Sequence, residues 1–136
     1  MKIEICTDPA RLDVDAIHAF LTRSYWAAGV TRERVARALA RALCFGLYAD
    51  GAQIGFARVV TDGVTFGYLC DVYVLEAHRG LGLGKRLVEA VRAHPDLQGL
   101  RRLLLKTLDA HGLYEQFGFA RVEDGRNLMQ IRGEAP

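Results

Sequence analysis

The sequence predicts an α+β fold, in which helices pack on one mixed β-sheet, and two kinds of pattern along its 136 residues carry this prediction. Several segments alternate apolar and polar side chains or are rich in β-branched and aromatic residues, as strands are. Other segments repeat apolar residues at helical spacing. Hydrophobic residues make up 51% of the chain and charged residues 25%, the balance of a globular protein rather than a disordered one. We expect one domain over residues 1–136.

The first half of the chain is expected to form a strand, two helices and three strands. Ile3 and Ile5 alternate with polar residues in a strand that ends near Pro9. A helix from about Asp13 to Gly29 and a second one capped by Thr31 follow. Their apolar faces are Ile17, Phe20, Leu21 and Tyr25 in the first and Val35, Leu39 and Leu43 in the second. Strands over 44–49, 53–60 and 65–74 are joined by turns at Asp50-Gly51 and Asp62-Gly63.

The second half completes the order β-α-α-β-β-β-α-β-α-β-β. Apolar residues at helical spacing between Leu83 and Val91 predict a helix that Pro95 ends. The short apolar segment 103–106 predicts a central strand. Asp109 is expected to cap a helix that runs to about Phe117. The segments 119–122 and 127–131 are expected to form a final hairpin around Asp124-Gly125.

The charge balance points away from nucleic acid as a partner. Eighteen Lys and Arg residues against 16 Asp and Glu leave a net charge of +2, whereas duplex-binding proteins usually carry a concentrated basic face. No apolar run approaches a membrane span, and the N-terminus lacks the apolar core of a signal peptide. Cys6, Cys44 and Cys70 lie among apolar neighbours, as reduced core thiols do. We therefore expect a cytoplasmic protein with no nucleic-acid or membrane partner.

A glycine-rich segment after the 65–74 strand carries the strongest functional signal. Gly80, Gly82 and Gly84 let the backbone approach a ligand closely, and the N–H groups of the first helical turn point at the same place. Together with Arg79 and Lys85, this junction predicts an anion site suited to phosphates. The spacing fits neither the dinucleotide-binding fingerprint nor the Walker A loop. A turn that only tightens the packing of the helix on the strand is the alternative.

Two motifs resemble those of the GCN5-related N-acetyltransferase (GNAT) superfamily. Arg79-x-x-Gly82-x-Gly84 matches its pyrophosphate loop, and residues 114–119, Tyr-Glu-Gln-Phe-Gly-Phe, match its Y-x-x-x-G-F signature on the next helix. The resemblance covers almost the whole chain and is closest to small bacterial single-domain members. It implies the acyl-CoA N-acyltransferase fold of that superfamily.

The resemblance also implies a reaction. Acetyl-CoA would serve as co-substrate, without a metal, and a primary amine of a small molecule or peptide would attack its thioester directly in a ternary complex. The family often forms homodimers, which the resemblance allows here. The residues that it implies at the acetyl-CoA site are Val72, Tyr73, Val74, Arg79, Gly80, Leu81, Gly82, Leu83, Gly84, Lys85 and Thr107. Thr107 stands where many members of the family carry an asparagine.

Two residues are candidates for the chemistry. The resemblance implies that Tyr114 donates a proton or a hydrogen bond to the departing thiolate, and a core aromatic is the alternative for this residue. Asp71 lies on the strand beside the expected acetyl site, where it acts as the general base or orients a neighbouring group. Glu76 is expected to be a solvated loop charge.

The acceptor pocket is expected near the end of the first helix. Tyr25 and Trp26 form the wall of an aromatic or cationic pocket, or else pack in the core. Arg58 lies in the middle of a strand, where it pairs with Asp71 or holds a substrate carboxylate. Two rival functions remain at this point: a non-catalytic acyl-CoA-binding module, and an acetyltransferase that modifies proteins.

Overall fold

The computed structural model describes residues 1–136 and contains one five-stranded sheet in the order β1-β2-β3-β4-β5. The first four strands are antiparallel neighbours, and β5 runs parallel to β4. The strands are β1 (Ile3–Cys6), β2 (Leu43–Ala49), β3 (Ala52–Thr61), β4 (Phe66–Val74) and β5 (Arg102–Leu105). The helices are α1 (Val14–Leu21), α2 (Arg32–Leu39), α3 (Leu83–Ala93) and α4 (His111–Glu115). The predicted mixed sheet with helices is confirmed.

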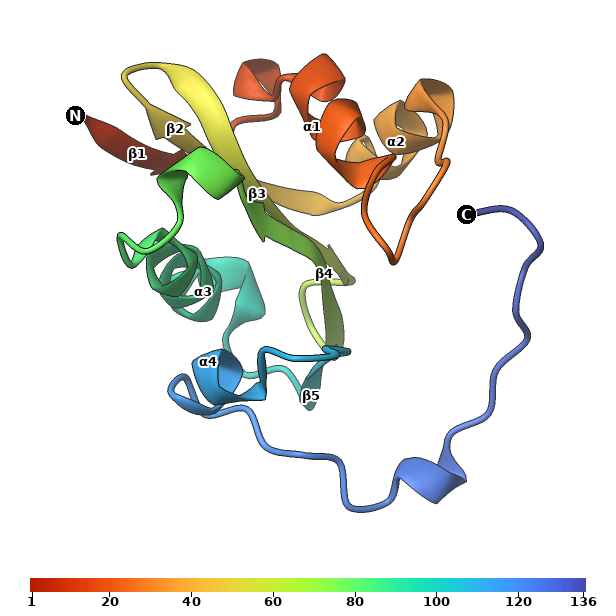
Figure 1. Cartoon of the computed structure of the whole chain (residues 1–136). Coiled ribbons are helices and arrows are strands. Elements are labelled where there is room, and N and C mark those ends of the chain that lie inside the picture. The colour runs from red at the N-terminus through yellow and green to blue at the C-terminus, as the bar shows by residue number, and fades with distance from the viewer.

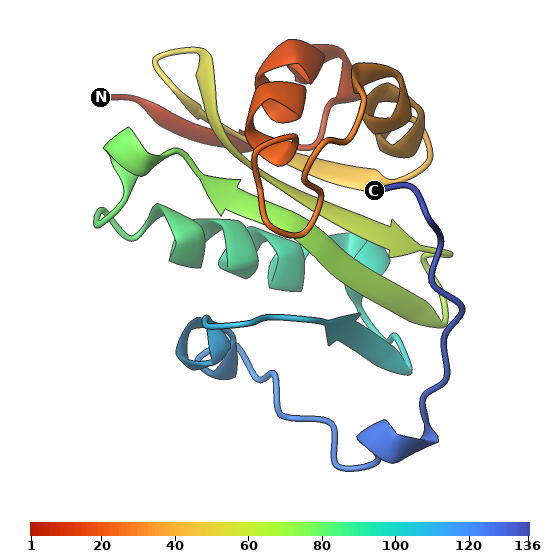
Figure 2. The same ribbon diagram turned by 45° about the vertical axis from the view of Figure 1, so that its right-hand side comes forward.

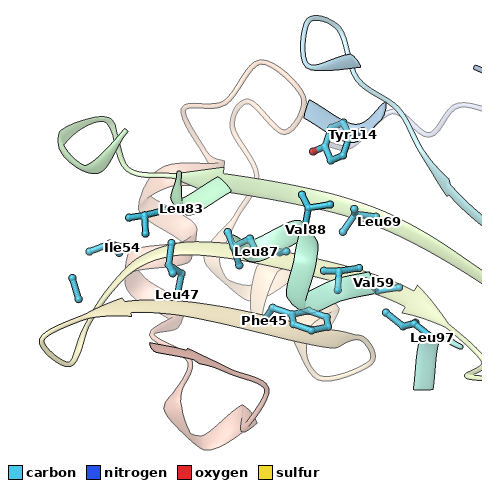
Figure 3. Close-up of a cluster of buried hydrophobic side chains, with 13 residues drawn as sticks. Phe45, Leu47, Ile54, Val59, Leu69, Leu83, Leu87, Val88, Leu97 and Tyr114 are labelled. Carbon is cyan, nitrogen blue, oxygen red and sulfur yellow. The ribbon is translucent and has the colours of Figure 1, made fainter. Parts of the chain in front are cut away.

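The helices cover both faces of the sheet. Figures 1 and 2 show α1 and α2 on one face and α3 on the other. The cluster under α3 includes Phe45, Leu47 and Leu87, each at most 1% exposed (Figure 3), and a second cluster under α1 and α2 includes Ile17 and Phe56. Alternating side chains along β2 and β3 supply both clusters, since neighbouring residues of a strand point to opposite faces.

The first helix ends earlier than the sequence predicts. Asp13 caps it by accepting a hydrogen bond from the Ala16 N–H at 3.0 Å, but α1 stops at Leu21. The Ser24 hydroxyl donates to the Leu21 carbonyl at 2.7 Å and accepts from the Ala27 N–H at 3.1 Å. These bonds compete with helix propagation, so residues 22–29 form a loop and Tyr25 does not lie on a buried helical face. Leu43, expected on the second helix, belongs to β2 instead.

The C-terminal third departs most from prediction. The segment expected to form a central strand, β5, lies at the edge of the sheet, because no strand forms beyond it. The Thr107 hydroxyl, rather than Asp109, binds the Ala110 N–H at the start of α4, at 3.0 Å. The expected final hairpin is absent: the Asn127 N–H bonds to the Asp124 carbonyl in a 3₁₀ turn, which does not reverse the chain into a paired strand.

None of the helices combines the length and apolar character that a membrane crossing requires.

Candidate active site

The glycine-rich segment forms an open loop whose backbone N–H groups are unused. From Gly80 to Lys85, no N–H donates a hydrogen bond within the chain. Gly80 and Gly82 have φ angles of +81° and +75°, and a Cβ at either position would meet no atom within 4 Å. These glycines are therefore required by backbone conformation rather than by crowding. A run of free N–H groups at the start of an 11-residue helix, α3, can bind an anion.

The charged side chains of this loop have different roles. Lys85 is exposed beside the free N–H groups. The uncharged Leu81 of the same loop is also exposed. Arg79 donates from Nε to the Val74 carbonyl at 3.1 Å, which ties the loop to the end of β4. Its terminal nitrogens make no hydrogen bond within the chain, so they can still contact an anion.

Several predicted acetyl-CoA contacts offer only their backbone. The Tyr73 side chain is buried and stacks on Phe20, with ring centroids 3.9 Å apart, and the Leu83 side chain lies in the core. Burial raises the pKa of the Tyr73 phenol well above its usual range. Val72 and Val74 are half-buried and pack against the α3 cluster. These four residues can therefore contact a bound ligand chiefly through main-chain groups.

The strands β4 and β5 separate beside this loop. Their pairing ends at Leu69 and Leu105, so β4 continues from Cys70 to Val74 without a neighbour on that side (Figure 2). The Leu75 N–H donates to Ile54 of β3. Because N–H groups alternate in direction along a strand, the N–H of Val74 faces the opening. A main-chain donor at this position can stabilise a developing oxyanion.

Tyr114 lies on α4 at the margin of the larger core cluster. Figure 3 shows its ring near Val88 and Leu69, and the residue is 9% exposed. Phe119 packs edge-on against it, with ring centroids 5.7 Å apart. Burial raises the pKa of the Tyr114 phenol, and the nearby Tyr25 phenol contributes in the same direction. Tyr114 thus remains a protonated donor at neutral pH, and Thr107 positions the helix that carries it.

Asp71 is the centre of a polar network on the α1 face of the sheet. Its Oδ2 accepts from Arg58 Nε at 2.9 Å, and its Oδ1 accepts from Trp26 Nε1 at 2.9 Å. The predicted pairing of Arg58 with Asp71 is confirmed, and their side chains are 20% and 12% exposed. Burial alone would lower the pKa of Arg58, but Cys70 and Asp71 raise it overall. Both oxygens of Asp71 already accept hydrogen bonds, whereas a general base needs a free oxygen to accept a proton from the substrate.

The backbone at Asp71 is unusual. Phe56 pairs with Tyr73 and Arg58 with Cys70, so Asp71 and Val72 together lie opposite Ala57 as a β-bulge. Asp71 has a φ of +55°, which aspartate tolerates better than most residues. The alternation of apolar and polar residues in the sequence does not indicate this bulge.

The loop 22–29 adds an aromatic wall above this network. Trp26 is 41% exposed and Tyr25 67%, with ring centroids 5.1 Å apart in an edge-on arrangement. Neither residue is part of the core, and Trp26 is fixed by its bond to Asp71. The terminal nitrogens of Arg58 make no hydrogen bond within the chain.

The sequence does not predict the ion pair between Arg23 and Glu76. Arg23 donates from both terminal nitrogens to the Glu76 carboxylate, at 2.6 and 3.0 Å, which joins the end of α1 to the start of the glycine-rich loop. Arg23 lowers the pKa of Glu76 to about 2. Glu76 is solvated, as the sequence predicts, since its side chain is 51% exposed, but it also forms an ion pair that the sequence does not predict. The two residues are 53 positions apart, so no local pattern could have revealed their pairing.

Comparison with known proteins gives consistent matches. A family model described as the acetyltransferase (GNAT) family matches residues 10–119. A Gibberella zeae protein, "Putative acetyltransferase FG08082", is 38% identical over 133 residues, which cover 81% of this chain and 74% of that protein.

Solved structures give the same result. A GNAT-family structure from Xanthomonas campestris pv. campestris is 46% identical, with a TM-score of 0.94, over 98% of this chain and 94% of that one. A Clostridium acetobutylicum structure, described as a predicted acetyltransferase with acetyl-CoA, has a TM-score of 0.69 and 13% identity over 96% of this chain and 95% of that one. At that identity the likeness concerns the fold alone.

Proposed function

Because the chain belongs to the acetyltransferase (GNAT) family, whose model matches residues 10–119, we propose that it is an acetyl-CoA-dependent N-acetyltransferase. Family membership supports acetyl transfer in general. The finer proposal is that the acceptor is a primary amine of a small molecule or peptide, which attacks the thioester directly.

The observation that carries the proposal is the run of free N–H groups from Gly80 to Lys85 beside the opening between β4 and β5. A pyrophosphate bound to these N–H groups, with Lys85 and Arg79 nearby, would direct the rest of acetyl-CoA along β4. The main chain of Val72 to Val74 would then lie beside the pantetheine arm. Thr107, on the far side of the opening, would supply one further hydrogen bond.

The proposed reaction requires that the protein assist removal of the amine proton, stabilise the oxyanion and assist departure of the thiolate. The amine nitrogen bonds to the thioester carbon and loses a proton, the carbon–sulfur bond breaks, and the CoA thiolate gains a proton. For a lysine-like amine, deprotonation at pH 7 costs about 4–5 kcal/mol. The Val74 N–H would stabilise the oxyanion of the tetrahedral intermediate.

Tyr114 would act on the departing thiolate. A free tyrosine has a pKa about 1.5 units above that of a free thiol, so full proton transfer costs about 2 kcal/mol even without burial. Burial raises the pKa of Tyr114 further. We therefore assign Tyr114 the role of a hydrogen-bond donor to the leaving sulfur in the transition state, with solvent completing the protonation.

Asp71 suits a positioning role better than that of general base. Its two oxygens already bind Trp26 and Arg58, so it would hold the acceptor wall in place while water removes the amine proton. The acceptor would lie against Tyr25 and Trp26, within reach of the free terminal nitrogens of Arg58.

Thiol release from acetyl-CoA, measured across a panel of amines, tests the proposal. Acceptor-dependent release by the wild type, strongly reduced in Tyr114→Phe, is expected. Tight binding of acetyl-CoA with no release for any amine would indicate a non-catalytic binding module. Labelled acetyl-CoA incubated with cell extract would reveal a protein-modifying enzyme if the label appears on proteins alone.

A further inference from the structure

Arg58 uses only one of its N–H groups within the chain. A guanidinium carries five N–H donors in a planar fork, and here Nε donates to Asp71 at 2.9 Å. Nη1 and Nη2 have no partner, although the side chain is only 20% exposed. Both nitrogens still reach solvent, because His78 Nδ1 is the one fully buried side-chain nitrogen or oxygen that lacks a hydrogen bond. The end of the Arg58 fork is therefore accessible to a ligand.

Tyr68 provides a second unpaired donor on the same face of the sheet. It lies on β4 two residues before Cys70, which pairs with Arg58 of β3. Arg58 and Tyr68 are therefore diagonal neighbours, close enough for a long and an aromatic side chain to contact one ligand. The Tyr68 hydroxyl makes no hydrogen bond within the chain. Burial raises the pKa of this phenol, and the charge of Arg58 opposes the rise, so Tyr68 remains a protonated donor at neutral pH.

The sheet face around these two donors is not covered by a helix. Val60 and Phe66, each two residues from one of the donors along its strand, are 44% and 41% exposed. The loop 22–29 reaches down to β4 beside them (Figure 2), where the indole of Trp26 is bound to Asp71. The two donors thus lie on an open surface with apolar and aromatic sides.

The charges on this side of the sheet favour an anion. Asp71 offsets part of the charge of Arg58, but both of its oxygens already accept hydrogen bonds. The helix α2, which lies beside α1 over this face (Figures 1 and 2), contains only one acidic residue. Three arginines of α2 and the turn after it are exposed and form no ion pair, namely Arg34, Arg37 and Arg41. Their charge would attract an anionic ligand toward Arg58.

We propose that the acceptor is a small amino carboxylate, whose carboxylate binds to the terminal nitrogens of Arg58 and to the hydroxyl of Tyr68. A carboxylate matches the parallel N–H groups at the end of a guanidinium fork. The carbon chain of the acceptor would lie against Trp26, and its amine would face the opening between β4 and β5. The inference rests on the proposed acetyltransferase function and names the class of amine that it accepts.

The first experiment compares each amino acid with its own primary amide as an acceptor. The panel is glycine, β-alanine, γ-aminobutyrate and phenylalanine, so that the spacing between amine and carboxylate varies. For the best acid of the panel, we expect kcat/KM to exceed that of the matching amide by about 10- to 100-fold, as loss of hydrogen bonds to a charged group implies. An amide that is used as well as its acid at every spacing would overturn the proposal.

Two variants assign this preference to the proposed donors. Arg58→Lys keeps a positive charge beside Asp71 but removes the fork, and Tyr68→Phe removes a hydroxyl that makes no hydrogen bond within the chain. Each is expected to lower the acid-to-amide ratio of kcat/KM by about tenfold. Arg101→Lys is the matched control, because Arg101 is an exposed arginine just before β5, and its ratio is expected to equal that of the wild type. A ratio that Arg58→Lys leaves intact would overturn the proposal, since general damage to the fold lowers both rates and not their ratio.

Binding measured without turnover separates this proposal from the proposed activity. Trp26 is the only tryptophan of the chain, so its fluorescence reports ligands at this surface. With CoA present, the acids are expected to change the emission at lower concentration than the amides, and Arg58→Lys is expected to abolish the difference. Such a result with no acetyl transfer would refute the activity and leave the carboxylate site standing. No response to any acid, or a stronger response to inorganic phosphate than to every acid, would overturn the carboxylate site.

Discussion

Replacing Asp71 by asparagine should destabilise the protein through Arg58 while leaving the backbone of the bulge intact. Asparagine tolerates the left-handed conformation that Asp71 adopts, with φ of +55°. It retains one oxygen acceptor for two donors and removes the negative charge. Arg58, 20% exposed, would then hold a guanidinium with no charged partner.

The expected loss of stability follows from the partial burial of Arg58 and Asp71. A hydrogen bond to a charged group contributes about 1.5–3 kcal/mol, and a fully buried charge left alone costs about 3–5 kcal/mol. With both side chains partly exposed, we expect Asp71→Asn to lower the free energy of unfolding by about 2 kcal/mol. For a domain of this size the melting temperature should fall by about 6–10 °C. Asp71→Ala should cost about 1 kcal/mol more, because alanine is strained at positive φ.

Urea unfolding of a double-mutant cycle with Arg58→Met would measure the pair directly. We expect a coupling energy of about 1.5–2 kcal/mol between the two positions. Arg58→Met with Val60→Met serves as a control cycle, because Val60 lies on the same strand and is exposed. A coupling energy near zero for Arg58 and Asp71 would refute the argument that burial makes this ion pair stabilising.

Asp71→Asn also distinguishes a positioning role of Asp71 from a role as general base. If Asp71 holds Trp26 and Arg58 in place, Asp71→Asn should raise the KM for the amine and keep the acidic limb of the pH–rate profile. Trp26→Phe, which removes only the indole donor to Asp71, should reproduce part of that rise. Loss of the acidic limb in Asp71→Asn alone would instead identify Asp71 as the general base.

Three further predictions concern the loop, the leaving group and pH. Tyr114→Phe should lower kcat about 100-fold or more with little change in the KM for acetyl-CoA, as measured by steady-state kinetics. Gly82→Ala should cost about 1–2 kcal/mol, since φ is +75° there, and weaken CoA binding in calorimetry, whereas Gly133→Ala should change neither. Arg23 lowers the pKa of Glu76 from 4.5 to about 2. The stability that Glu76→Gln removes should therefore be present above pH 4.5 and vanish as pH falls toward 2 in thermal melts; a constant difference would contradict this pairing.

The sequence predicts those elements whose signals are local. The positions of β2, β3 and β4 agree with prediction because apolar and β-branched residues lie between turn residues at Asp50-Gly51 and Asp62-Gly63. Likewise, the predicted cap at Thr31 is confirmed, because its side chain accepts from the Arg34 N–H only three residues later.

The errors concern features that depend on distant or absent partners. An apolar run such as 103–106 does not reveal how many neighbours the strand has, and β5 lies at an edge because residues 119–131 do not pair with it. In the candidate site, the pairing of Arg58 with Asp71 follows from adjacent strands, but the contact of Trp26 requires the loop 22–29 to fold over the sheet. The bulge at Asp71 arises from register between strands, which a single sequence does not encode as a pattern.

The bulge at Asp71 links the two halves of the site physically. An extra residue in β4 shifts its register against β3 just before Val72 to Val74, the segment proposed to lie along acetyl-CoA. The same shift directs the Asp71 carboxylate to Trp26 on the loop 22–29. That loop has a second attachment, from Arg23 to Glu76, where the glycine-rich loop begins. The proposed acceptor wall is therefore fixed to the strand and to the loop that would hold the acetyl donor, so one strand irregularity sets their relative position. A direct-attack reaction needs the amine and the thioester held at a defined separation, which this pair of attachments would provide.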